Sequence, residues 1–148
     1  MSRFPFEYWF LLLGLSPLLG CDWGPRIVPV SGQVVIDGKP LQNGFVRFIP
    51  DNARAASSEI DGNGRFTLTT VDANDGCVVG KHKVEIISKE FPSQTQTLWL
   101  IPRKYSDLAT SGLEIMIERP QTDLKIELRW DGGQPEVENT DSQGDIPP

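Results

Sequence analysis

Residues 124–130 read LKIELRW, and an apolar side chain occupies every second position of this stretch. Successive side chains of a β-strand point to opposite faces, so the segment has one apolar and one charged face. A strand of this kind is stable when its apolar face packs against a second layer. We therefore expect Ile126 and Leu128 to face the core of a two-layered β protein.

Other segments repeat this alternation and are separated by residues that favour turns. Asp37-Gly38 and Asp61-Gly62-Asn63-Gly64 are strong turn signals, because glycine readily adopts the positive φ that tight turns need. No segment shows a helical period of useful length. The further expected strands are 30–36, 45–50, 55–60, 65–70, 80–88 and 113–118. The sequence thus predicts a seven-stranded antiparallel β-sandwich over residues 30–130.

Within that sandwich, one face of each strand supplies the core. The expected core residues are Val34, Phe66, Leu68, Val84, Ile86, Ile115, Ile117, Ile126 and Leu128. The stretch from Lys89 to Gly112 breaks the alternation with Pro92 and Pro102. We expect it to be a long connection with a short extended piece around Trp99.

The same connection contains the best candidates for a recognition surface, Lys104, Tyr105, Ser106 and Asp107. Long connections in compact domains are often functional. The favoured alternative is structural, with the Tyr105 ring packed on the sandwich edge and Ser106 and Asp107 capping a turn.

The N-terminus predicts an export signal. An uncharged, leucine-rich run ends at Gly20 and is too short to span a bilayer. Leu18-Leu19-Gly20-Cys21 resembles the bacterial lipobox, in which the cysteine receives a diacylglycerol and becomes the mature N-terminus. We expect residues 1–20 to be a signal peptide, Cys21 to be lipidated, and residues 21–29 to be a tether. The chain would then be exported and lipid-anchored to a membrane of the bacterial cell envelope.

Two alternatives stay open in this region. Cys21 could follow an ordinary secretory signal by coincidence, in which case it would carry no lipid. Trp23 could lie at the membrane interface beside the lipid, or it could be an exposed tether residue.

Charge is unevenly distributed along the chain, whose formal net charge is -6. Residues 131–148 contain five acids and no Lys or Arg, whereas the body is nearly neutral. The tail has too little apolar surface to offset the entropy of ordering, so we expect a disordered acidic tail over 131–148. Nucleic acid is excluded as a partner, because phosphate binding needs clustered Lys and Arg.

Several sequence motifs resemble those of carboxypeptidase regulatory-like domains, which are transthyretin-like β-sandwiches. The motifs are Val30-Ser31-Gly32-Gln33-Val34, Asp37-Gly38-Lys39-Pro40-Leu41, Phe45-Val46-Arg47-Phe48-Ile49-Pro50, Asp61-Gly62-Asn63-Gly64-Arg65-Phe66 and Gly80-Lys81-His82-Lys83-Val84. Ile101-Pro102-Arg103-Lys104-Tyr105-Ser106-Asp107 and Thr110-Ser111-Gly112-Leu113 resemble small lipoproteins of the planctomycete type, whose function is generally unassigned. The resemblance implies an accessory module without catalytic residues.

Few residues are candidates for a catalytic or metal-binding role. His82 could act as a general base, but no nucleophile or acid is marked beside it, which favours a structural histidine. Cys77 is more typical of a semi-buried thiol than of a nucleophile. Asp72, Asn74 and Asp75 could hold Ca²⁺, but they lack the later bidentate acid of an EF-hand loop, which favours an Asx-type turn.

We therefore expect a non-enzymatic envelope protein with no cofactor and no metal, whose β-sandwich binds an envelope protein or glycan or acts structurally. The alternatives are a secreted hydrolase with a site around His82 and a purely structural spacer. The sequence specifies neither the partner nor the oligomeric state.

Overall fold

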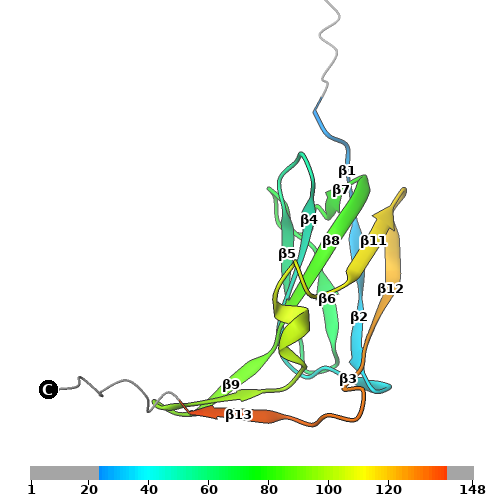
Figure 1. The fold of residues 1–148 in the computed structure, drawn as a ribbon. Helices are drawn as coiled ribbons and strands as arrows, with labels where there is room; N and C mark the ends of the chain where they lie inside the picture. Colours follow the sequence, from blue (N-terminus) through cyan, green and yellow to red (C-terminus); the bar gives the residue numbers. More distant parts are fainter. Residues whose placement is uncertain (1–23, 140–148) are drawn as a thin grey trace, which may run out of the picture.

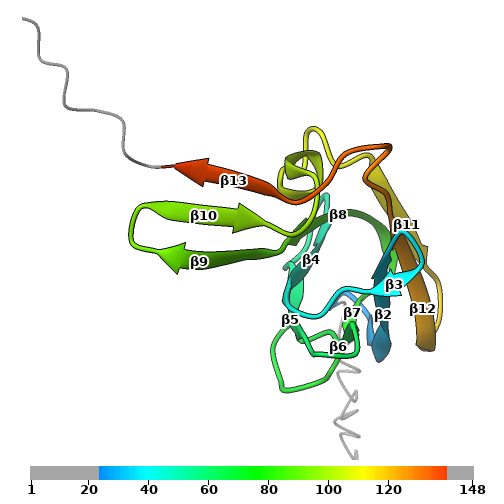
Figure 2. The same ribbon diagram turned by 90° about the horizontal axis from the view of Figure 1, so that it is seen from below.

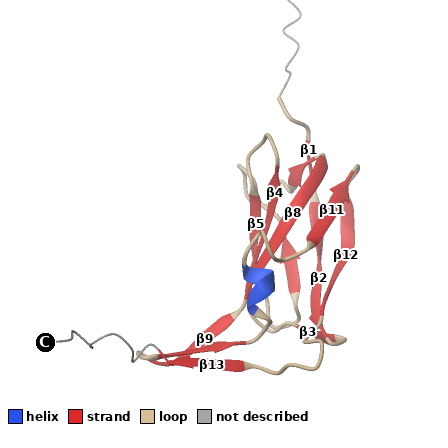
Figure 3. Cartoon of the chain, viewed as in Figure 1, coloured by secondary structure: helices blue, strands red, loops and turns tan. Residues whose placement is uncertain are grey.

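The computed structural model describes residues 24–139 and is all-β (Figures 1 and 3). The strands are β1 (Ile27–Val28), β2 (Val30–Ile36), β3 (Lys39–Pro40), β4 (Gly44–Pro50), β5 (Ala56–Ile60), β6 (Arg65–Thr67), β7 (Cys77–Val78), β8 (Gly80–Ile87), β9 (Lys89–Ser93), β10 (Gln96–Trp99), β11 (Leu113–Ile117), β12 (Gln121–Leu128) and β13 (Glu136–Asn139). A single 3-10 turn, η1 (Arg103–Ser106), is the helical element of this range. The predicted signal peptide, Cys21 and Trp23 lie outside the described residues.

Two sheets form the body of the molecule. One has the strand order β11-β8-β4-β5, and the other contains β12-β2-β3 with β6 also paired to β2. One cluster of buried apolar side chains draws on strands of both sheets. The all-β expectation is confirmed, with the layered arrangement of a β-sandwich. No helix within residues 24–139 is long and apolar enough to cross a membrane.

The expectation of a wholly antiparallel sandwich is wrong at one pair, because β12 runs parallel to β2. The chain leaves β11 and crosses to the other sheet, so its last long strand lies beside the first one in the same direction (Figure 2). Gly32 permits this close pairing: a Cβ there would lie 2.0 Å from the carbonyl oxygen of Leu124. Pairing between strands this distant in sequence cannot be identified from alternation alone.

The core matches the alternation pattern closely. Of the nine expected core residues, Ile115 is half-buried against the core and the others are buried. Phe48 adds an aromatic contact, with its ring centre 6.2 Å from that of Phe66. The turn signals are also confirmed: Asp61 Oδ1 accepts the backbone N–H groups of Asn63 and Arg65.

The connection after β8 is more ordered than expected. Its strands β9 and β10 form a hairpin, and β13 pairs with the other edge of β10. We call this three-stranded sheet the arm; it projects away from the sandwich in both views (Figures 1 and 2). After the arm, Ile101 and Tyr105 return to the core, and the Tyr105 hydroxyl accepts the Arg129 N–H at 3.2 Å.

The tail prediction is therefore wrong for Glu136–Asn139, which form β13. The segment is too polar to build a core, but adding a strand to a hairpin edge requires mainly backbone hydrogen bonds. Ion pairs from Arg103 to Glu136 and Glu138 help to hold it. Residues 140–148 lie outside the described part of the chain.

Candidate functional site

Three directly opposed residues form a row across the outer face of the β5-β4-β8 layer. Phe45 lies opposite Glu59 on one side and opposite Ile87 on the other. Opposed residues share a face of a sheet. The next residue on β4, Val46, is fully buried, so the Phe45 row faces outward. The Phe45 side chain is 49% exposed.

The arm begins directly beyond this row, and a small hydrogen-bond network fixes its base. The Ser88 hydroxyl lies 2.8 Å from the Asn43 carbonyl oxygen and 3.0 Å from Asn43 Oδ1. Asn43 Nδ2 in turn donates to Glu90 at 3.0 Å. These contacts hold β9 against the start of β4, and they leave Phe91 of β9 66% exposed.

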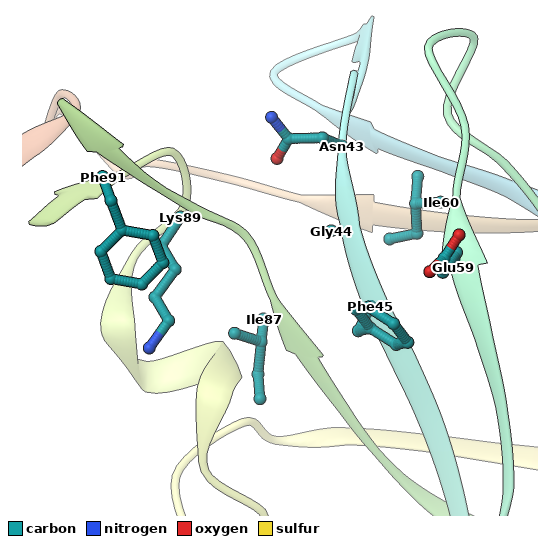
Figure 4. Close-up of a pocket in the computed structure, with 8 residues that line it drawn as sticks. All are labelled: Asn43, Gly44, Phe45, Glu59, Ile60, Ile87, Lys89 and Phe91. Carbon is teal, nitrogen blue, oxygen red and sulfur yellow. The ribbon is translucent and has the colours of Figure 1, made fainter.

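The row and the base of the arm enclose a concave site of about 410 Å³, which we call the corner pocket (Figure 4). It is lined by Asn43, Gly44, Phe45, Glu59, Ile60, Ile87, Lys89 and Phe91. Figure 4 shows Lys89 and Phe91 on the arm side and Glu59 on the β5 side, with Phe45 and Ile87 between them. The pocket is thus apolar along its middle and carries one charge of each sign at its rims.

Aromatic rings hold the cationic rim of the pocket in place. The Lys89 ammonium lies 5.3 Å from the centre of the Phe91 ring and 5.5 Å from that of Trp99. Such cation–π contacts keep a lysine close to aromatic faces while leaving it partly hydrated. In the next row of the sheet, Arg47 pairs with the largely buried Glu85 at 2.6 Å.

Trp99 is held by polar contacts on the arm. Its Nε1 donates to Glu138 at 3.0 Å, and the Arg103 guanidinium lies 5.3 Å from its ring centre. The hydrogen bond from Trp99 is the main cause that lowers the pKa of the Glu138 carboxyl; desolvation opposes it, and the charge of Arg103 adds to the lowering. These contacts join β10, β13 and η1.

His82 is buried, with 1% of its surface exposed, as expected for a structural histidine. Its Nδ1 lies 3.0 Å from the Gly80 carbonyl oxygen, so this nitrogen carries the proton of the neutral ring. The ring packs 5.8 Å from that of Phe48, and Nε2 has no hydrogen-bond partner within residues 24–139. Burial lowers the pKa of His82, although the Gly80 contact opposes the shift.

Cys77 is fully buried in β7, deeper than the semi-buried position expected. Burial raises the pKa of its thiol to about 11, with a further contribution from the charge of Asp75. A thiol of this kind remains protonated and is a poor nucleophile near neutral pH.

The expected turn is present, since the Asp75 N–H donates to the Asp72 carbonyl oxygen at 3.0 Å, but it is not of the Asx type, because the Asp75 side chain reaches back to earlier residues. The Asp75 carboxylate accepts the backbone N–H groups of Thr70 at 2.7 Å and of Val71 and Asp72 at 2.9 and 3.0 Å. Desolvation works to raise the pKa of Asp75, but these hydrogen bonds together outweigh it and lower the pKa. Among residues 24–139, no group of three or more His, Cys, Asp or Glu side chains is placed to hold a metal ion.

The residues of the 104–107 segment, which were candidates for a recognition surface, make contacts within the protein. Lys104 pairs with Asp131 at 2.9 Å, Ser106 donates to the Arg103 carbonyl, and Asp107 accepts the Ala109 N–H. This matches the favoured alternative for Tyr105, Ser106 and Asp107. None of these residues lines the corner pocket.

Sequence reasoning missed the corner pocket. Residues 45–50 contain the pattern that could have indicated it. Val46 and Phe48 form the buried face of this strand, yet Phe45 and Ile49 on the opposite face are also apolar. A strand with apolar residues on both faces has either a second covering layer or an exposed apolar site.

No family model matches this chain, and neither a curated protein nor a solved structure matches it. Its function therefore has to be inferred from its own residues and geometry.

Proposed function

We propose that this chain is an exported lipoprotein, anchored through Cys21 to a membrane of the bacterial cell envelope. Its β-sandwich is a non-enzymatic module that binds a partner of the envelope in the corner pocket. The anchor rests on the resemblance of Leu18-Leu19-Gly20-Cys21 to the lipobox. The likeness to carboxypeptidase regulatory-like domains is consistent with an accessory, non-catalytic module.

The observation that carries the binding role is the gathering of exposed apolar side chains in one concave place. Phe45 and Phe91 are two of the five exposed large apolar residues of the described chain, and both line the corner pocket beside Ile87. Exposed apolar clusters with a few polar groups at the rim mark binding sites. The lining contains no Ser, Thr, Cys or His, and its two charged groups, Glu59 and Lys89, stand on opposite rims.

The position of the pocket suits an anchored protein. Strand β1 and the arm lie at opposite ends of the sandwich (Figure 1). Strand β8 spans eight residues between these ends, which corresponds to roughly 26 Å at the usual rise of a strand. A chain tethered through its N-terminus would therefore present the corner pocket away from the membrane, towards partners in the adjoining space.

Metabolic labelling with an alkyne fatty acid tests the anchor. The wild-type chain should be labelled and the Cys21→Ser variant should not. Equal labelling of both chains would refute lipidation at Cys21.

Photo-cross-linking in living cells tests the binding role. p-Benzoylphenylalanine in place of Phe91 should yield a defined adduct. The same amino acid in place of Val71, which is 59% exposed in the loop before β7, serves as the matched control. Equal or absent adducts at both positions would contradict binding at the corner pocket.

A further inference from the structure

We propose that the occupant of the corner pocket is an extended peptide segment of another envelope protein. Its side chains at alternate positions are a cation, a large apolar group and an anion. This inference rests on the proposed binding role of the corner pocket and names the chemistry of its partner.

The charges at the two rims argue for this pattern. Glu59 is exposed on β5, and its carboxylate has no ion-pair partner among residues 24–139. Lys89 stands on the arm side, where its ammonium lies against the rings of Phe91 and Trp99. Its charge also acts at longer range on Glu138, but it forms no salt bridge among residues 24–139. A partner cation therefore complements Glu59, and a partner anion complements Lys89. The apolar side chain between them meets Phe45, Ile87 and Phe91.

The spacing of the rims suits an extended chain. Glu59 and Ile87 lie on strands separated by β4, which places their backbones about 10 Å apart at the usual strand spacing. Lys89 lies two residues beyond Ile87, so the two rims are roughly 12 Å apart. In an extended peptide, residues i, i+2 and i+4 share a face and cover about 13 Å. Such a segment reaches both rims while its central side chain enters the pocket.

The polar groups of the pocket favour a peptide over a glycan. Asn43 is already engaged, because its backbone carbonyl oxygen and its Oδ1 accept from the Ser88 hydroxyl and its Nδ2 donates to Glu90. A sugar carries hydroxyl groups in every direction and needs many donors and acceptors to replace its water. The corner pocket offers mainly one carboxylate and one ammonium, which suit a ligand with two separated charges.

Nuclear magnetic resonance titration of the full chain in detergent micelles tests this proposal. The probes are short capped peptides centred on Lys-Ser-Phe-Ser-Glu, Lys-Ser-Phe-Ser-Lys, Glu-Ser-Phe-Ser-Glu and Lys-Ser-Ser-Ser-Glu, together with chitotetraose. The Lys-Ser-Phe-Ser-Glu peptide should shift the amide signals of the β4 and β9 strands and bind most tightly. Each mismatched charge should weaken binding about threefold, since rim ion pairs contribute little individually.

A charge swap on the protein sharpens the test. In Glu59→Lys both rims are cationic, so the preferred peptide should become Glu-Ser-Phe-Ser-Glu. The matched control is Glu118→Lys, an exposed acid just after β11, which should keep the wild-type preference. This exchange of preference distinguishes a local charge match from a general effect of net charge.

Three results would overturn the inference. The proposed peptide pattern is wrong if the Glu59→Lys variant and the wild type rank the charged peptides in the same order of affinity. It is also wrong if chitotetraose alone shifts the β4 and β9 signals, although the binding role of the pocket would then stand. If neither ligand binds and the Phe91 cross-linker gives no more adduct than the Val71 control, the inference and the proposed function both fail.

Discussion

The sandwich and the arm are built from the same kind of strand but are stabilised in different ways. Each of the long sandwich strands β2, β4, β8 and β12 carries at least two buried residues. No residue of β9, β10 or β13 is buried. The arm is held by backbone pairing, by the Trp99–Glu138 hydrogen bond and by exposed ion pairs from Arg103.

This difference explains why the corner pocket lies at the junction. Buried apolar surface stabilises the sandwich by about 25 cal/mol per Å², whereas exposed ion pairs contribute at most about 1 kcal/mol each. One wall of the pocket, the Phe45 row, therefore belongs to the stable sandwich. The other wall, β9, can be displaced at a lower cost in free energy. A site of this construction can adjust to a partner without disturbing the core.

The largest effect is expected in the sandwich core. Ile126→Ala removes a side chain that is 3% exposed and should lower the free energy of unfolding by roughly 2–5 kcal/mol. The matched change on the arm is Leu98→Ala at a half-buried position, which should cost less than about 1 kcal/mol. Urea denaturation of both variants measures the contrast. Similar costs at the two positions would mean that the arm shares the core.

A smaller effect is expected from acid, and again from the sandwich. His82 is buried and neutral, and its pKa is lowered, so the unfolded chain binds the extra proton more readily. Stability should therefore fall as the pH drops below about 6.5, the ordinary pKa of histidine. The slope should be at most about 1.4 kcal/mol per pH unit for one proton. His82→Phe, which keeps a ring beside Phe48, should remove this part of the slope; an unchanged slope would contradict the assignment.

The arm should respond to substitution locally. Trp99→Ala removes the hydrogen bond to Glu138 and the ring that faces Lys89 and Arg103. Hydrogen exchange of the β10 and β13 amides should accelerate by about tenfold or more, while the β4 and β8 amides stay protected. Acceleration throughout the sandwich would show that the two parts unfold together.

The smallest effect on stability is expected in the corner pocket itself. Phe91 is 66% exposed, so Phe91→Ser should change the free energy of unfolding by less than about 0.5 kcal/mol. A loss several times larger, measured by urea denaturation, would assign the ring a packing role instead.

The sequence predicted the sandwich because period-two alternation reports burial directly. Ile126 and Leu128 have charged neighbours on either side, so the pattern indicates clearly which face of this strand is buried. Parallel pairing of β2 with β12 was not predictable in this way, because alternation gives the face of a strand and not its neighbour.

The arm and the corner pocket could not be predicted for a related reason. Strand β9 contains Pro92 and no buried position, and β13 lies in an acidic stretch that resembles a solvated tail. Their pairing depends on backbone groups, which every sequence supplies, and on the Trp99–Glu138 contact between residues far apart in the chain. The pocket exists only once β9 is placed beside the Phe45 row.

The central claim is that the exposed rings of the corner pocket serve recognition. The most direct measurement places p-benzoylphenylalanine at Ile87, on the floor of the pocket, and compares adduct yield in cells between the otherwise unchanged chain and the Phe45→Ser/Phe91→Ser variant. The account predicts equal amounts of protein and an adduct reduced by about fivefold or more in the variant, as for loss of aromatic anchors from an interface. An undiminished adduct at equal protein amount would contradict it.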